Sequence, residues 1–110
     1  MNKNLPKKTK VVVIGGGVAG CSVAYHLAKF GWKDTILLER DQLTSGTTWH
    51  AAGLVGQLGA TATITNLRKY SLDLYKELEK KTELSTGLKQ NGAITIASSK
   101  ERFQELLRQA

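Results

Sequence analysis

The sequence predicts an α/β fold that begins with a strand, a helix and a second strand. Residues 10–14, KVVVI, form a short β-branched run that stops at glycines, as a buried strand of a parallel sheet does. Residues 17–30 place apolar side chains at helical spacing, and Gly31 follows as a stop signal. Residues 35–39, TILLE, form a second apolar run. The three segments occupy about 30 residues, which is the size of one βαβ unit.

The next segment, residues 44–60, is rich in glycine and has little periodicity, so we expect an irregular loop there. A helix is then expected from Ala62 to Lys81, where Glu77 and Lys81 form a favourably oriented i,i+4 pair. The apolar stripe of this helix consists of Ile64, Leu67, Leu74 and Leu78.

The last part of the chain changes to a period of two. Residues 86–97 place Leu88, Ile94 and Ile96 on one face, and the Asn91–Gly92 step suits a tight hairpin turn. Ser99 is then expected to cap a helix over residues 100–109. We therefore expect a disordered basic tail (1–9), a first domain (10–85), and the start of an antiparallel sheet in a second domain (86–110). Because two parallel strands make an incomplete sheet, we expect the chain to be the N-terminal part of a longer protein.

Composition and charge exclude several classes of protein. No apolar run approaches the roughly 18 residues of a membrane span, and the polar first ten residues lack the apolar segment of a secretory signal. A cytoplasmic location is therefore expected. The net charge of +7 comes partly from lysines in the tail, and basic clusters with aromatics are missing, which argues against nucleic-acid binding. The single Cys21 excludes an internal disulfide and a Cys-based zinc site, and we expect no metal.

Residues 15–20, GGGVAG, match the dinucleotide-binding pattern G-x-G-x-x-G between the first strand and the helix. In this pattern Gly15 allows a tight turn, Gly17 lets a pyrophosphate approach the backbone, and Gly20 lets helix and strand pack closely. The N–H groups of Val18 and Ala19, at the start of the helix, are expected to face the phosphates.

An acid at the end of the second strand completes the pattern. Glu39 follows the glycines by about 20 residues, where a carboxylate accepts hydrogen bonds from the ribose hydroxyls. The same carboxylate would repel the 2′-phosphate of an NADP-type cofactor. The residues therefore predict a dinucleotide site in a Rossmann-like domain, and they leave open whether the dinucleotide is FAD or NAD.

Three stretches of the chain resemble one enzyme family. The runs GGGVAGCSVAYHLAKFG, LLERDQLTSGTTWHAAGL and TGLKQNGAITIAS resemble the N-terminal region of the sarcosine and dimethylglycine dehydrogenases, in the D-amino-acid-oxidase-like class of FAD amine oxidoreductases. The resemblance covers nearly the whole chain from Lys10. It implies that the residues above bind FAD, that the loop after the second strand wraps the flavin, and that the segment from 86 begins the substrate domain.

The resemblance also assigns roles within the loop. His50 matches the histidine that the family joins covalently to the 8α-methyl carbon of the flavin, and a largely neutral imidazole is a suitable nucleophile for that carbon. Trp49 is expected to cover the flavin or to lie in a core, and Arg40 to reach the adenosine or to lie on the surface. The FAD-contacting residues implied by the loop are Gly46, Thr47, Thr48, Trp49, His50, Ala51, Ala52, Gly53 and Leu54.

The implied reaction is the oxidative demethylation of an N-methylglycine such as sarcosine or dimethylglycine. A hydride equivalent passes from the substrate to flavin N5, and the imine hydrolyses to formaldehyde and the demethylated amine. The resemblance implies an electron-transferring flavoprotein as acceptor, tetrahydrofolate as a possible one-carbon acceptor, and the mitochondrial matrix as the location in a eukaryote. The catalytic residues are expected downstream.

Three alternatives remain at this point. The first is another FAD amine or amino-acid oxidase of the same class, with FAD bound non-covalently. The second is a flavoprotein-like regulatory subunit that has lost catalysis. The third is an NAD-dependent dehydrogenase, which would need a nicotinamide pocket where the TTWHAAG loop lies.

Overall fold

The computed structural model describes residues 6–110, and these divide into two compact units between Leu54 and Val55. Most of the predicted basic tail lies at residues 1–5, outside the described residues. At the end of that tail, the Thr9 hydroxyl donates to the backbone oxygen of Asp34 (2.9 Å) and to its carboxylate (3.0 Å). Thr9 is thereby joined to the residue that precedes the second strand.

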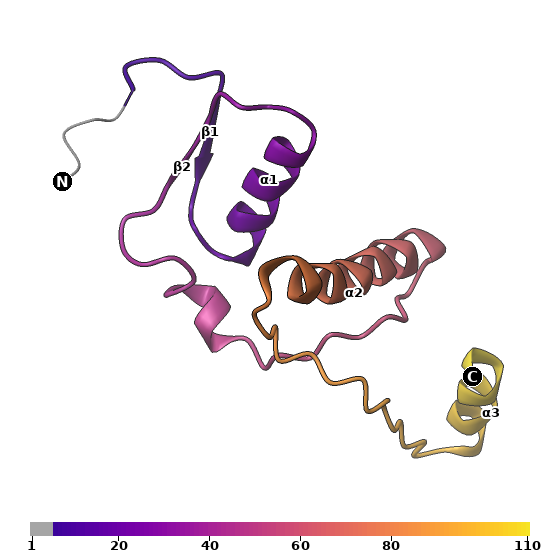
Figure 1. The fold of residues 1–110 in the computed structure, drawn as a ribbon. Helices are drawn as coiled ribbons and strands as arrows, with labels where there is room; N and C mark the ends of the chain where they lie inside the picture. Colours follow the sequence, from indigo (N-terminus) through magenta and orange to yellow (C-terminus); the bar gives the residue numbers. More distant parts are fainter. Residues whose placement is uncertain (1–5) are drawn as a thin grey trace. The chain divides into compact units, whose positions relative to one another are not determined.

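The first unit contains the predicted βαβ arrangement (Figure 1). Strand β1 (Val11–Ile14) and strand β2 (Thr35–Leu38) pair in parallel, with Val11 opposite Thr35 and Ile14 opposite Leu38. Helix α1 (Val18–Lys29) is the crossover between them. The prediction of a strand, a helix and a parallel strand is therefore confirmed.

Helix α1 ends where the sequence places its stop signal. Gly31 has a φ of 86°, and its N–H donates to the oxygen of Ala28, while the N–H of Trp32 donates to the oxygen of Leu27. These two bonds form a Schellman motif, which satisfies carbonyls at the end of the helix. The chain can then turn directly into β2.

The junction between β1 and α1 is tight because glycines lie at both sides of it. Gly15 adopts a φ of 102°, which turns the chain out of the strand. A Cβ atom at Gly20 would lie 1.8 Å from the backbone oxygen of Gly15 and 3.6 Å from Val13 Cγ1. Only glycine fits at position 20, and Val13, one of two buried apolar side chains among residues 6–110, lies beneath the helix.

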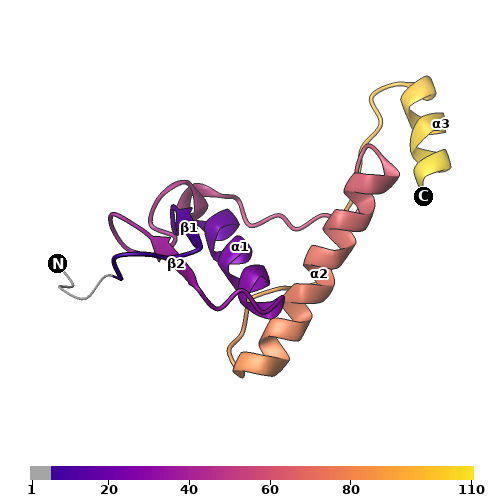
Figure 2. The same cartoon turned by 90° about the horizontal axis from the view of Figure 1, so that it is seen from above.

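The second unit contains helix α2 (Ala62–Thr82) and helix α3 (Lys100–Gln109), as predicted (Figure 2). Thr61 Oγ1 accepts the N–H of Ile64 at the start of α2, and Ser99 Oγ accepts the N–H of Arg102 at the start of α3 (3.2 Å). The expected ion pair between Glu77 and Lys81 forms, with both side chains partly exposed to solvent.

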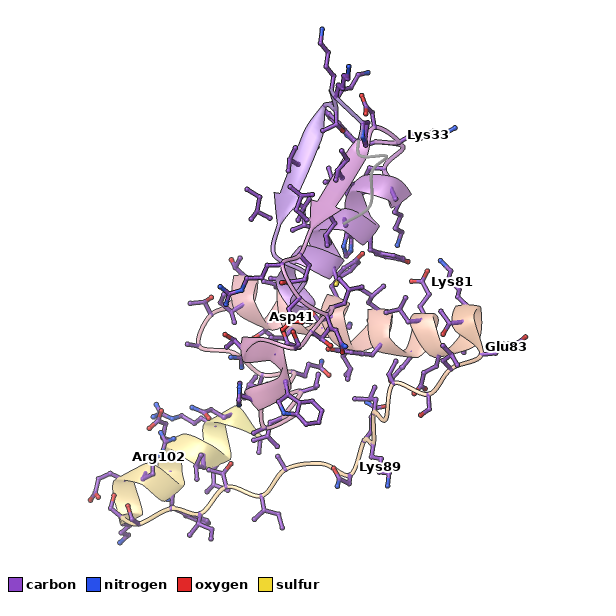
Figure 3. The ribbon with its side chains drawn as sticks, turned by 90° about the vertical axis from the view of Figure 1, so that its left-hand side faces the viewer. Lys33, Asp41, Lys81, Glu83, Lys89 and Arg102 are labelled. Atoms are coloured by element: carbon purple, nitrogen blue, oxygen red, sulfur yellow. The ribbon has the colours of Figure 1, made fainter. Side chains whose placement is uncertain are left out.

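The buried face of α2 differs from the predicted stripe. Leu72 is the buried residue, with 7% of its surface exposed, whereas Leu67 of the stripe is 60% exposed and Ile64 is 39% exposed. Glu83 is the C-cap residue of α2 and has the left-handed conformation, with a φ of 57°. Lys81, in the last turn of the helix, and Glu83 are labelled in Figure 3.

The hairpin predicted over residues 86–97 is not formed in the structure. These residues are extended but unpaired, and Ile94 is 94% exposed. Gly92 has the positive φ of a tight turn (77°), but Asn91 has none, whereas the type I′ turn requires positive φ at both residues. A two-stranded hairpin is only marginally stable without further strands or packing, and the described residues supply neither here. In the part of the chain that is described, no helix is long and apolar enough to cross a membrane.

We predict that Gly20→Ala destabilises the protein, because its methyl group would collide with the Gly15 carbonyl and push α1 away from β1. The expected cost is about 3 kcal/mol in the free energy of unfolding. Thermal unfolding of the full-length protein measures it. Gly56→Ala is the matched control, since a Cβ there meets nothing within 4 Å. Equal melting temperatures for the two variants would contradict the tight junction.

Candidate functional site

The candidate site lies at the carboxyl end of the parallel strands, where β1 passes into α1. The buried Gly16 donates its N–H to Glu39 Oε2 at 2.6 Å, and the N–H of Gly15 donates to the oxygen of Leu38 at 2.8 Å. The glycine motif and the acid after β2 are therefore in direct contact. The sequence placed both at this edge of the sheet, and the structure brings them together.

The Glu39 carboxylate is held by three backbone N–H groups. Besides the bond from Gly16, its Oε1 accepts the N–H of Arg40 at 2.8 Å and that of Asp41 at 3.2 Å; Asp41 is labelled in Figure 3. These backbone hydrogen bonds lower the pKa of Glu39 from its ordinary value of 4.5, and the bond from Gly16 has the largest effect. An ionised carboxylate has about four acceptor sites, so Oε2 has room for a further hydrogen bond besides that from Gly16.

The loop after β2 folds back over the glycine motif, a contact that the sequence analysis missed. The N–H of Thr44 donates to the Gly16 oxygen at 2.8 Å, and Leu43 Cδ2 lies 2.5 Å from where a Cβ of Gly16 would be. Position 16 is the variable position of the G-x-G pattern, yet here it has no room for a side chain. The G-x-G-x-x-G pattern by itself does not predict that the loop after β2 contacts Gly16.

A short 3₁₀ helix, η1 (Thr47–His50), lies in the loop that was predicted to be irregular. It follows Gly46, whose oxygen accepts the N–H of Trp49 at 3.1 Å. The half-buried Thr48 accepts the N–H of Val18 on its Oγ1, at 2.9 Å. One residue of the TTWH turn thus contacts the N-terminus of α1, where the phosphates are expected.

The other predicted site residues are solvent-exposed. Trp49 is 79% exposed and Leu54 is 91% exposed, and His50 is exposed at the end of η1. Gly53 has a φ of 71°. The exposed predicted residues are Ala19, Arg40, Gly46, Thr47, Ala51, Ala52 and Gly53. The structure therefore brings the glycine motif, Glu39 and Thr48 together, and it leaves Trp49 and His50 on the surface.

These residues fit a dinucleotide. Gly16 and Gly17 keep the turn free of side chains, and a Cβ at Gly17 would already lie 3.0 Å from Thr48 Oγ1. The first N–H groups of α1 have no partner inside the helix and carry the positive end of its dipole, as a diphosphate requires. Among the described residues, no group of His, Cys, Asp and Glu could hold a metal ion.

The model of the family "FAD dependent oxidoreductase" matches residues 10–110. The chain belongs to this family. The match covers the βαβ unit, the loop with η1 and both later helices. FAD is the dinucleotide named for this family, so family membership favours FAD over NAD, the choice that the glycine motif left open.

The chain is similar to several curated proteins. It is 47% identical over 103 residues to 4-methylaminobutanoate oxidase (formaldehyde-forming) of Paenarthrobacter nicotinovorans, and this match covers 94% of the chain. It is also 47% identical over 108 residues to mitochondrial sarcosine dehydrogenase of Homo sapiens, over 97% of the chain. A mitochondrial pyruvate dehydrogenase phosphatase regulatory subunit of Mus musculus is 39% identical over 94% of the chain. In each case the chain spans 12% of the relative's length.

A solved structure resembles the fold of this chain. The glycine oxidase of Bacillus cereus ATCC 14579 superimposes with a TM-score of 0.68 and 32% sequence identity. The superposition covers 92% of this chain and 29% of the oxidase.

We predict that Glu39 makes stability depend on pH in the acidic range. Its pKa is lowered in the folded protein, so its contribution is complete above about pH 4.5 and is lost as the pH falls through the folded pKa. Glu39→Gln removes the negative charge and leaves one oxygen for the three N–H groups that the carboxylate accepts, so it should lower the melting temperature at pH 7. The difference from the parent protein should shrink as the pH falls below 4.5 and through the lowered pKa of Glu39.

Thermal melts of the full-length protein across this pH range measure the effect. Asp41→Asn is the matched control, because it removes a neighbouring negative charge but not the acceptor of the Gly16 N–H. If Glu39→Gln and Asp41→Asn give the same pH profile, the bond to Gly16 does not carry the effect.

Proposed function

We propose that the protein is an FAD-dependent dehydrogenase that oxidatively demethylates an N-methylglycine such as sarcosine or dimethylglycine. The observation that carries this proposal is the contact between the TTWH turn and the glycine motif, through Thr48 and Val18. It brings the loop that resembles the flavin-binding loop of these dehydrogenases to the expected phosphate site. The identity of 47% with sarcosine dehydrogenase supports the substrate class.

The chain's residues hold different parts of the cofactor in this proposal. The N–H groups of Val18 and Ala19 bind the pyrophosphate at the positive end of α1, and the free acceptor site of Glu39 takes a ribose hydroxyl. Apart from Thr48, which contacts the N-terminus of α1, residues 46–54 are proposed to lie against the isoalloxazine, where small side chains permit close approach to a flat ring. Arg40, beside Glu39, reaches the adenosine portion. FAD, when bound, accepts a hydride equivalent at N5.

His50 is proposed as the point of covalent attachment, through the flavin 8α-methyl carbon. It is exposed at the end of η1, so its imidazole is accessible to a flavin that approaches the outer side of the turn. Trp49, which is 79% exposed, is proposed to cover one side of the same ring. A covalent bond would prevent loss of the cofactor.

The remaining steps require parts of the protein beyond this chain. The imine product hydrolyses to formaldehyde and the demethylated amine, an electron-transferring flavoprotein accepts the electrons, and tetrahydrofolate is a possible acceptor of the one-carbon unit. The segment from residue 86 is proposed to begin the substrate domain. The location is proposed to be cytoplasmic, or the mitochondrial matrix in a eukaryote, where the human relative is found according to its name.

Two alternatives have specific support. The relative from Paenarthrobacter nicotinovorans is named an oxidase of 4-methylaminobutanoate, with the same identity of 47%, so a longer N-methylamino acid is a second candidate substrate. The relative named as a phosphatase regulatory subunit supports a flavoprotein without catalysis. These alternatives share the FAD site and differ in turnover.

We predict that His50→Ala abolishes covalent flavin but leaves FAD bound, because the glycine motif and Glu39 are unchanged. The full-length protein is denatured in acid, and flavin fluorescence is measured in the protein and in the supernatant. The parent protein and the control His26→Ala should keep flavin on the polypeptide, and His50→Ala should release it. Flavin released from the parent protein would refute the tether while leaving the FAD site intact.

We predict that the full-length holoenzyme reduces an artificial electron acceptor with sarcosine or dimethylglycine and releases formaldehyde. The two substrates are compared with 4-methylaminobutanoate by kcat/KM. Preference for the longer substrate would replace the proposed substrate by the first alternative. An enzyme that binds FAD but oxidises none of the three would favour a non-catalytic flavoprotein.

A further inference from the structure

The extended segment 86–97 contains an Asn-Gly step that is open to solvent. Asn91 and Gly92 are both exposed, and neither belongs to a helix, a strand or a hydrogen-bonded turn. Gly92 has a φ of 77°, and a Cβ there would meet nothing within 4 Å. Within the described part of the chain, neither the Gly92 N–H nor the Asn91 side chain makes a hydrogen bond. Lys89, two residues before Asn91, is labelled on this segment in Figure 3.

An asparagine followed by glycine can undergo a reaction that needs only water. The Gly92 nitrogen loses its proton and attacks Asn91 Cγ, so that a new C–N bond forms. The bond from Cγ to the side-chain nitrogen breaks, and ammonia leaves. Water then opens the resulting five-membered succinimide at one of its two carbonyls, which gives aspartate or isoaspartate.

Three features of the segment favour this attack. Glycine has no side chain that would obstruct the approach of its own nitrogen to Cγ. The Gly92 N–H has no partner in the described chain, so no hydrogen bond has to be given up before the nitrogen reacts. The backbone beside Asn91 is unpaired and can rotate into the reactive geometry without breaking a sheet or a helix.

The same reaction is disfavoured at Asn66. Of the four asparagines in the sequence, only Asn91 is followed by glycine. Asn66 lies inside α2, and the next residue is Leu67, whose branched side chain obstructs the attacking nitrogen. The helix also fixes the backbone at this position. Asn66 is therefore an internal control for the reactivity of Asn91.

We propose that Asn91 is a site of spontaneous deamidation, an inference that is independent of the FAD site. The product places a negative charge two residues from Lys89, and isoaspartate also adds one methylene to the main chain. Because side chains alternate along a strand, the extra methylene disturbs the register of Ile94 and Ile96 against any strand that pairs with this segment. Deamidation thus limits how long the segment keeps its capacity to pair.

The test incubates the full-length holoprotein in mildly alkaline buffer, both native and denatured, and follows the tryptic peptide 90–100 by liquid chromatography and mass spectrometry. A sample digested without incubation gives the background. The native protein should form aspartate and isoaspartate at position 91 within about tenfold of the denatured rate, because an unpaired segment opens at almost no free-energy cost. The rate should fall in mildly acidic buffer, since the nitrogen must lose a proton. Asn66, in peptide 41–68, should stay unchanged in the native protein.

Two variants test the chemistry of the step. Asn91→Gln keeps an exposed side-chain amide but requires a larger ring, and it should lose the isoaspartate signal. Gly92→Ala adds a methyl group next to the attacking nitrogen and should also lose most of the signal, in the denatured protein as well if the variant does not fold. A native rate more than about tenfold below the denatured rate would show that Asn91 is protected by structure and would overturn the proposal. An isoaspartate signal that persists in Asn91→Gln would overturn it as well.

Discussion

The close approach of α1 to the end of β1 is the constraint on which the site depends. A helix that begins at Val18 can lie against the strand only because position 20 has no side chain to strike the Gly15 carbonyl. The parallel register then places the end of β2 beside the same turn, since Ile14 pairs with Leu38 and the next residues are Gly15 and Glu39. The meeting of helix N-terminus, glycine turn and acid follows from this packing.

The site places an acid beside a positive helix end without leaving either group unsatisfied. Glu39 lies off the helix axis and takes the N–H of Gly16, in the turn before α1, together with two N–H groups of its own loop. The N–H of Val18, on the helix itself, is held by the neutral Thr48 hydroxyl. Because the carboxylate does not use the helix donors, a diphosphate and a ribose can be held by adjacent but separate groups.

The parts of the fold that could be predicted from the sequence depend on local interactions. The Gly31 stop and the Ser99 cap each involve residues within about one turn of a helix, and the structure confirms them. The prediction of a hairpin at 86–97 was wrong, because a hairpin needs further strands or packing to be stable and a local sequence pattern does not show whether they are present. The contact of Thr48 with Val18 was missed because it joins residues 30 apart and has no periodicity.

The geometry of a 3₁₀ helix explains why Trp49 and His50 are exposed although Thr48, in the same turn, contacts α1. Successive residues of such a helix differ in direction by about 120°. When Thr48 faces α1, the next two side chains must therefore leave the turn on its other sides, as the 79% exposure of Trp49 shows. The TTWH turn therefore directs the Thr48 hydroxyl toward α1 and leaves the His50 side chain exposed. Both orientations are consequences of one turn of backbone.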